Sequence, residues 1–218
     1  MDSTAKGLGL GEKSGIELYE NTGHRANEET KKKLYKGDDA KWFQADKITA
    51  AIGQSDNRFT PMQLCVYTST LAMKGTRYKA TFLNRVVSAD YRELLLESEK
   101  TVMSHLEISD DAYQAYSTGM NLVTKKTDLR GTANKIFNNY PIEICAKTGT
   151  AQSGSNVSSD HGAFVCYAPM KNPEIAIAIY GEKAGHGSSL AVIGKSILDM
   201  YFEVGEVGEV VTSENKAS

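Results

Sequence analysis

Four neighbouring residues, Lys147-Thr148-Gly149-Thr150, offer the most chemistry in this chain, because they combine a cation, two hydroxyls and a position without a side chain. On an extended strand, Lys147 and Gly149 would point to one face and Thr148 and Thr150 to the other. We interpret the hydroxyls as a binding site for a carboxylate and Lys147 as a fixed positive charge. Gly149 would let a substrate backbone lie against the strand as an added strand. The amide N–H near Thr150 could then form half of an oxyanion hole. An ordinary strand with an exposed lysine is the alternative interpretation, since so short a motif recurs by chance.

The elements that must position these residues are strands of one sheet. Apolar residues at alternate places before Lys147 predict a strand over 142–152. Similar patterns predict strands over 162–167 and 174–182, and the short loops make the three strands antiparallel neighbours. In the third strand the isoleucines face one way and the alanines the other. We expect the small alanines to let the helix that follows this strand approach closely.

A C-terminal helix follows the third strand at once, and we expect Ser188 or Ser189 to cap it. Its predicted inner stripe, at helical spacing, is Leu190, Ile193, Gly194, Ile197 and Tyr201.

Upstream, Thr60 and Pro61 predict the start of a helix that ends near Gly75. Residues 77–96 carry β-type runs, 131–139 form a short helix, and the glycine-rich segment 7–16 is predicted to be turns. A further helix is predicted over 109–125, and its inward residues are Ala112, Ala115, Tyr116, Met120 and Val123.

The composition is that of a globular protein, with 40% hydrophobic and 24% charged residues among 218. A net charge of -2 without a dense basic stripe argues against a nucleic-acid partner, and we interpret Lys31-Lys32-Lys33 as a solvated face. No segment is apolar for long enough to cross a membrane. The three cysteines match no metal or redox spacing, so we expect no metal and no cofactor. We interpret them as buried apolar residues, while a Cys145–Cys166 disulfide stays open.

A Lys-Thr-Gly strand beside a C-terminal helix resembles the serine transpeptidase fold of penicillin-binding proteins and β-lactamases. Longer segments resemble class B penicillin-binding proteins. The resemblance implies an α+β fold, an antiparallel sheet with the C-terminal helix packed on it. It makes 1–203 the C-terminal part of a transpeptidase domain. The Val-Gly-Glu repeats that follow predict a disordered tail over 204–218. The segments that carry it are 8–18, 51–64, 71–78, 119–120, 131–133, 162–167 and 185–189.

Members of this family attack with the serine of an S-x-x-K motif, aided by an S-x-N motif, and both precede the segment that here starts near Leu8. We therefore expect the chain to contain the Lys-Thr-Gly-Thr strand, which forms one wall of the active site, and to lack the nucleophilic serine. Ser3 to Lys6 spells S-x-x-K, but glycines follow at once and cannot continue a core helix. Ser55 to Asn57 spells S-x-N, and we interpret it as the lead into the Thr60 helix. A complete serine β-lactamase-like site that uses Ser3/Lys6 and Ser55/Asn57 stays open as an alternative.

The resemblance implies a peptidoglycan D,D-transpeptidase that cross-links stem peptides and binds β-lactams. Lys147 would be catalytic, Thr148, Gly149 and Thr150 would bind substrate, and no cofactor or metal is implied. The parent protein would act at the extracytoplasmic face of the bacterial cell membrane, anchored by a segment absent here. We expect the isolated chain to be inactive and its exposed apolar surface to favour self-association. A non-catalytic cell-wall binding or scaffolding module is the alternative from another class.

Overall fold

The computed structural model describes residues 1–128, 131–152 and 159–204. Its centre is an antiparallel three-stranded sheet in the order β5-β6-β7. The strands are β5 (Cys145–Ala151), β6 (His161–Ala168) and β7 (Ile175–Gly181). The three predicted strands are therefore present and antiparallel, with ends within three residues of the predicted ones.

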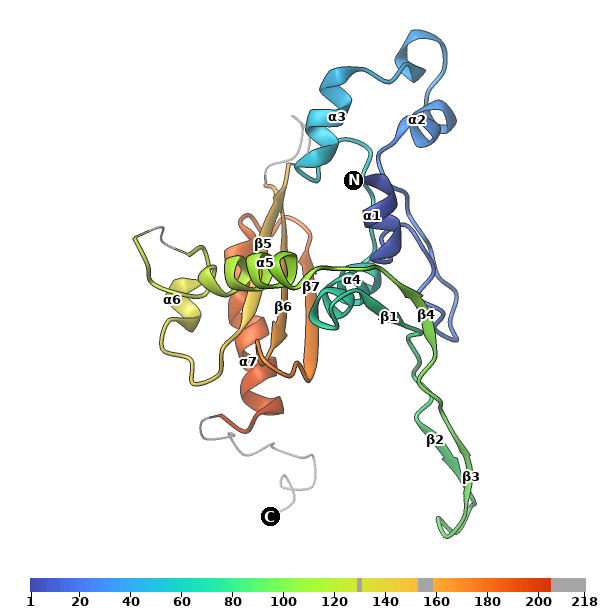
Figure 1. The fold of residues 1–218 in the computed structure, drawn as a ribbon, viewed down its shortest axis with the longest axis vertical. Coiled ribbons are helices and arrows are strands. Elements are labelled where there is room, and N and C mark those ends of the chain that lie inside the picture. Colours follow the sequence, from blue (N-terminus) through green and yellow to red (C-terminus); the bar gives the residue numbers. More distant parts are fainter. Residues whose placement is uncertain (129–130, 153–158, 205–218) are drawn as a thin grey trace, which may run out of the picture.

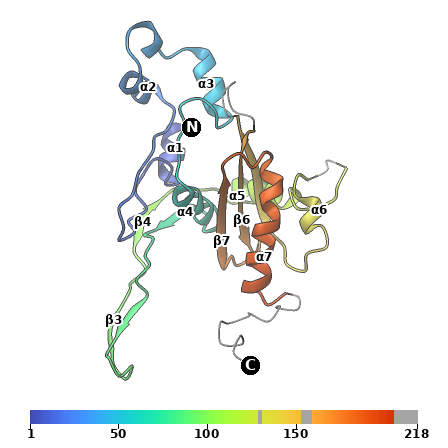
Figure 2. The same cartoon turned by 180° about the vertical axis from the view of Figure 1, so that it is seen from behind.

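Helices cover both faces of this sheet (Figures 1 and 2). On one face lie α4 (Pro61–Ala72), against β7, and α5 (Asp110–Leu122), against β5. On the other face the 3₁₀ turn η2 (Gly187–Leu190) and the C-terminal helix α7 (Ala191–Tyr201) contact β6. The α+β class and the helix packed on the sheet are confirmed.

The alanine face of β7 is covered by α4, not by the C-terminal helix, so that prediction was wrong. Cys65 of α4 lies there, and its Sγ donates to the Ala176 carbonyl at 3.4 Å. The isoleucine face carries the main core instead, where Ile177 packs with Phe164 and Leu198 of α7. Both faces of β7 are apolar, and its alanines face α4, which precedes the sheet in the sequence.

The inner stripe of α7 differs from the predicted one. Leu190 and Gly194 are buried as predicted, but Ile193, Ile197 and Tyr201 are exposed. Neither predicted serine caps the helix, because the chain makes a 3₁₀ turn first and α7 begins only at Ala191. That turn rotates the helix so that its buried residues are Ala191, Gly194 and Leu198.

The Thr60 helix forms as its cap signals predict. Thr60 Oγ1 accepts from the Gln63 amide and Gln63 Oε1 accepts from the Thr60 amide, which completes a capping box in front of Pro61. At the other end Gly75 has φ +93°, and its amide donates to the Thr70 carbonyl at 2.8 Å.

The inward side of α5 is more polar than predicted. Ser109 caps the helix, but Ala112 and Ala115 are exposed, while Ser117 and Asn121 are buried. These buried polar side chains have backbone partners, so burying them does not leave their hydrogen bonds unmade.

The remaining elements are short. Of the segment 7–16, which was predicted to be turns, residues 8–11 form turns and 13–16 are irregular, whereas the short helices before residue 52 were not predicted. Lys32 and Lys33 pair at i,i+4 with glutamates on α2, as a solvated helix face does. Lys31 differs from that prediction, because its side chain is mostly buried and pairs with Asp46 of α3 at 2.6 Å. Of the predicted tail only Val204 lies within the described residues. The short elements are α1 (Asp2–Gly7), α2 (Glu28–Leu34), η1 (Gly37–Ala40), α3 (Gln44–Ala51), β1 (Thr76–Tyr78) paired with β4 (Val102–His105), β2 (Arg85–Val87) paired with β3 (Leu94–Glu97), and α6 (Asn134–Phe137).

Within the described ranges no helix has the length and apolarity to cross a bilayer. The same residues contain no metal-binding group of histidine, cysteine and acidic side chains. All three cysteines are free. The Cys145–Cys166 disulfide is excluded by register, because Cys166 pairs with Ala146 and Cys145 with Tyr167, which puts the two thiols on opposite faces of the sheet.

Candidate functional site

The candidate site is strand β5, which carries Lys147-Thr148-Gly149-Thr150 at an edge of the sheet. Only β6 pairs with it among the described strands, so its other edge offers free backbone groups. The register places Lys147 opposite Val165 and Thr148 opposite Phe164. Lys147 and Thr150 are exposed, and Thr148 is half-buried on the face that carries α6 and α7. The side chains therefore alternate as the motif predicts.

The Lys147 ammonium lies along the strand. Its Nζ donates to the Thr148 carbonyl at 2.6 Å, and no carboxylate of the described residues pairs with it. Because its partner among the described residues is a carbonyl and not a carboxylate, the positive charge of Lys147 stays available to attract an incoming anion.

Thr148 has a partner that lies outside the four-residue motif. Its Oγ1 lies 2.8 Å from Oγ1 of Thr132, and either hydroxyl can be the donor. Thr132 is held by its two neighbours, because the Ala133 amide donates to the Val123 carbonyl and Gly131 fits closely against the end of α5. A Cβ on Gly131 would lie 2.2 Å from the Leu122 carbonyl oxygen. The site therefore includes a third hydroxyl, which the four-residue motif does not identify.

The two faces of Gly149 differ in how closely they are packed. Among the described residues, a Cβ built on Gly149 would meet only Ala163, at an ordinary 3.5 Å, so none of them fills the space above this residue. Behind the strand, Gly187 of η2 fits against it so closely that a Cβ there would lie 2.2 Å from the carbonyl oxygens of Gly149 and Ala163. The strand is thus backed on one side and open on the other.

The start of β5 is fixed by the polar side of α5. Asn121 Nδ2 donates to the Ile144 carbonyl at 3.0 Å. Thr124 Oγ1 lies 3.3 Å from the same oxygen and donates to the Asn121 carbonyl at 2.7 Å. Cys145 Sγ donates to the Ser117 carbonyl at 3.3 Å, and burial raises the pKa of this thiol to about 11. The thiol therefore stays protonated and packs as a small apolar group.

The S-x-x-K match (Ser3 to Lys6) and the S-x-N match (Ser55 to Asn57) lie in other parts of the structure. Ser3 and Lys6 are exposed on α1, a six-residue helix with no buried residue. Asn57 uses its whole side chain locally: Oδ1 accepts from the Ala26 amide at 2.8 Å, and Nδ2 donates to the Ala50 and Gln54 carbonyls. This amide holds a turn together.

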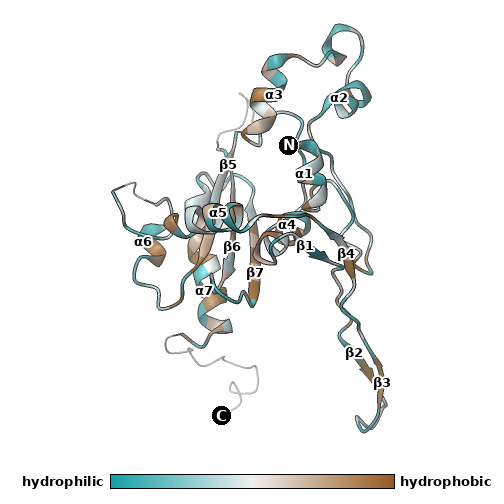
Figure 3. Ribbon diagram, in the orientation of Figure 1, coloured by the Kyte–Doolittle hydropathy of each residue, from teal (hydrophilic) through white to brown (hydrophobic). Residues whose placement is uncertain are grey.

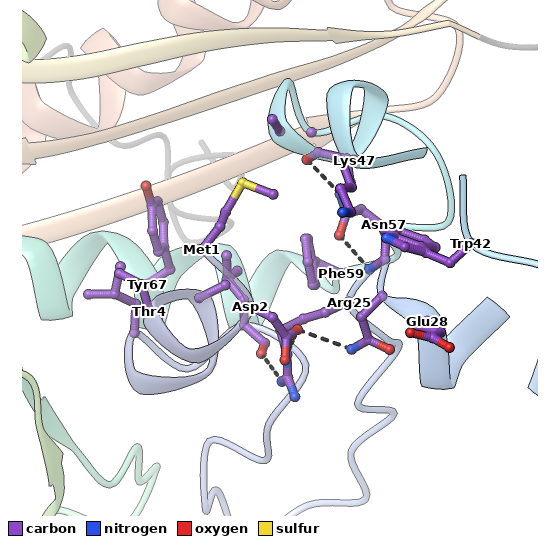
Figure 4. Close-up of a pocket in the computed structure, with 18 residues that line it drawn as sticks. Met1, Asp2, Thr4, Arg25, Glu28, Trp42, Lys47, Asn57, Phe59 and Tyr67 are labelled. Atoms are coloured by element: carbon purple, nitrogen blue, oxygen red, sulfur yellow. Dashed lines mark hydrogen bonds and ion pairs between the residues drawn. The ribbon is translucent and has the colours of Figure 1, made fainter. Parts of the chain in front are cut away.

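Asn57 also lines a cavity of about 570 Å³ between α1, α3 and α4 (Figure 4). The Arg25 guanidinium reaches it and is bound on several sides, with Asp2 and Glu12 carboxylates each at 3.0 Å and the Leu10 carbonyl at 2.6 Å. Arg25 and Asn57 thus bind backbone groups in the wall of this cavity, and none of the four motif residues lines it.

His161, at the start of β6, faces the turn after β7. Its Nδ1 accepts from the Lys183 amide at 3.2 Å, and its ring lies 5.8 Å from that of Tyr180. This histidine has a structural partner at the sheet end.

The comparisons with known proteins agree with this geometry. A family model described as the penicillin binding protein transpeptidase domain matches residues 1–199. The chain therefore belongs to the family of penicillin-binding protein transpeptidase domains.

Individual relatives cover almost the whole chain. It is 28% identical to the peptidoglycan D,D-transpeptidase MrdA of Acinetobacter baumannii over 92% of the chain, and 31% identical to penicillin-binding protein 2B of Streptococcus pneumoniae over 82%. Among solved structures, PBP2 of Pseudomonas aeruginosa, in complex with WCK 5153, superimposes with a TM-score of 0.75 and 26% identity over 98% of the chain.

The chain spans only part of each relative. It corresponds to 30% of the Acinetobacter protein, 25% of the Streptococcus protein and 45% of the Pseudomonas chain. The likeness thus concerns one part of longer proteins.

Proposed function

We propose that residues 1–203 form the C-terminal part of the transpeptidase domain of a peptidoglycan D,D-transpeptidase. The observation that carries this is the free edge of β5, where an exposed lysine, two threonines and a glycine with open space above it occur in a chain of this family. The parent protein acts at the extracytoplasmic face of the bacterial membrane, where peptidoglycan is cross-linked.

In this proposal the substrate is a stem peptide that ends in D-Ala-D-Ala, and it lies along β5 as an additional strand. Thr148 and Thr150 bind the terminal carboxylate, and Lys147 supplies the positive field that favours it. Gly149 leaves room for the peptide backbone. The hydroxyl of Thr132 supports this arrangement, because its bond to Thr148 fixes the rotamer of the hydroxyl that receives the carboxylate.

The reaction is acyl transfer by a serine. The serine of the S-x-x-K motif attacks the penultimate D-Ala carbonyl, terminal D-Ala leaves, and an amine of a neighbouring stem peptide takes the acyl group. The amide N–H near Thr150 donates to the oxyanion that forms. β-Lactams acylate the same serine, with their carboxylate in the place of the D-Ala carboxylate.

We place that serine outside this chain and propose that the 218 residues alone are inactive. Ser3 supports this, because its short exposed helix offers no buried base. Asn57 supports it too, since its amide is already committed to three backbone groups.

Labelled penicillin with intact-mass measurement tests this proposal. We expect no covalent adduct on the purified chain and an adduct on the full-length parent protein. An adduct that maps to Ser3 would establish the complete-site alternative, and a parent protein that penicillin never labels would refute the transpeptidase assignment.

The second candidate function is a binding or scaffolding module of the cell wall that performs no catalysis. The free β5 edge also suits reversible peptide binding. The two functions differ in their dependence on Lys147, because a transpeptidase site requires the positive charge of this residue.

A further inference from the structure

The two threonines of β5 differ in what holds their hydroxyls. β7 is coloured hydrophobic in Figure 3, whereas β5 carries the lysine and the two threonines of the motif. Oγ1 of Thr148 lies 2.8 Å from Oγ1 of Thr132, a residue outside the strand. Thr150 is exposed, and its hydroxyl has no hydrogen bond to another of the described residues. One motif hydroxyl is therefore restrained and the other can turn.

The backbone on both sides of Thr132 is held against the end of α5. The Ala133 amide donates to the Val123 carbonyl at 2.9 Å, and a Cβ on Gly131 would lie 2.5 Å from the same oxygen. The Asn134 amide donates to the Gly131 carbonyl at 3.1 Å and closes the turn. Thr132 itself is exposed, so the backbone, and not packing of its side chain, places its hydroxyl. A β-branched side chain also has few χ1 rotamers, which keeps this hydroxyl beside β5.

The direction of the bond between the two hydroxyls follows from the chemistry of a carboxylate ligand. Either hydroxyl can be the donor in the structure. A carboxylate only accepts hydrogen bonds, and a hydroxyl has a single proton. When Thr148 gives its proton to a carboxylate, the 2.8 Å contact therefore requires Thr132 to donate. A hydroxyl that accepts one hydrogen bond becomes a stronger donor in another.

We propose that Thr132 is a positioning residue for the carboxylate of the ligand, and that it acts through Thr148 by donating to its hydroxyl. This inference rests on the proposed function, in which Thr148 and Thr150 bind that carboxylate. Thr132 holds the Thr148 oxygen in place and leaves its proton for the ligand. Thr150 does not depend on Thr132, because no hydrogen bond joins the two side chains.

NMR titration of the ¹⁵N-labelled chain with an acetylated peptide ending in D-Ala-D-Ala tests the inference. We expect Thr132→Val, which keeps the shape and removes the hydroxyl, to weaken binding about fivefold. Thr132→Ser retains the hydroxyl and should bind within about twofold of the wild type. The matched control is Thr49→Val on α3, whose exposed hydroxyl donates to carbonyls of its own helix, and it should bind like the wild type. Circular dichroism verifies that each variant is folded.

Double variants test whether Thr132 acts through Thr148. We expect Thr148→Val to weaken binding about tenfold and Thr132→Val/Thr148→Val to weaken it no further, because the hydroxyl on which Thr132 acts is already gone. In a Thr150→Val background, by contrast, Thr132→Val should still weaken binding about fivefold. A merely structural role of Thr132 would give the same loss in both backgrounds, and that result would overturn the inference.

The failure of this inference differs from the failure of the proposed function. If the wild-type chain binds the peptide at residues 147–150 and Thr132→Val binds as tightly, Thr132 does not position the carboxylate, while the β5 site stands. If the wild-type chain does not bind the peptide, both the proposed function and the role of Thr132 are wrong.

Discussion

Replacing Gly187 by alanine tests how the candidate site is held in place. A Cβ at this position would lie 2.2 Å from two carbonyl oxygens and 2.9 Å from the Gly149 nitrogen, whereas ordinary van der Waals contact begins at 3.4 Å. The contacts are with backbone, so no side chain can move aside. η2 and β5 must separate by about 1 Å, and overpacking of this kind costs about 2–3 kcal/mol.

Urea denaturation followed by circular dichroism measures this effect. We expect Gly187→Ala to lower the free energy of unfolding by about 2–3 kcal/mol and the Tm by about 5–10 °C. Hydrogen exchange should also become faster at the Gly149 and Thr150 amides, because the support behind the strand is displaced.

Gly119→Ala is the matched control. A Cβ at Gly119 in α5 would meet none of the described residues within 4 Å, so alanine should stabilise the helix by about 0.5–1 kcal/mol. If the free energy of unfolding of Gly187→Ala instead lies within about 0.5 kcal/mol of the wild-type value, η2 does not hold β5 in place and the reasoning fails.

Two further predictions concern the support of β5 and its buried thiols. Asn121→Ala removes the 3.0 Å hydrogen bond to the Ile144 carbonyl and should lower the free energy of unfolding, measured by urea denaturation, by about 1–3 kcal/mol. The control, Gln114→Ala at an exposed position of α5, should change it little. Equal effects of the two variants would contradict the role of this hydrogen bond. Burial raises the thiol pKa values of Cys145 to about 11 and of Cys166 to about 12, so at pH 8 native thiols should alkylate far more slowly than unfolded ones. Because the folded state then binds more protons, stability should fall as the pH rises above about 9, by about 2 kcal/mol per thiol by pH 11. Stability that falls equally in a Cys145→Ala/Cys166→Ala variant would contradict this.

Local patterns predicted the parts of the fold that local physics decides. The period of two along β5 placed Lys147 and Thr148 on opposite faces, because strand geometry alone sets that alternation. The Thr60 helix starts where the sequence predicts, because its cap bonds join residues only three apart.

Long-range contacts decided what local patterns could not. Asn121 faces inward because its side chain donates to the Ile144 carbonyl, and the periodicity of α5 does not predict that partner. Similarly, the 3₁₀ turn before Ala191 rotated α7 and left Ile193 exposed. Thr132 joins the site only through a hydroxyl sixteen residues away, although the segment 131–133 was recognised as typical of the family.

The central claim, that β5 binds a stem-peptide carboxylate, is tested most directly by NMR titration of the ¹⁵N-labelled chain with an acetylated peptide ending in D-Ala-D-Ala. We predict shifts centred on residues 147–150 and at least about tenfold weaker binding in Lys147→Ala and Thr150→Val, because each variant removes a charge-assisted contact. Lys183→Ala, at the turn after β7, is the control and should bind like the wild type. Shifts confined to other elements, or binding that is unchanged in Lys147→Ala, would contradict the account.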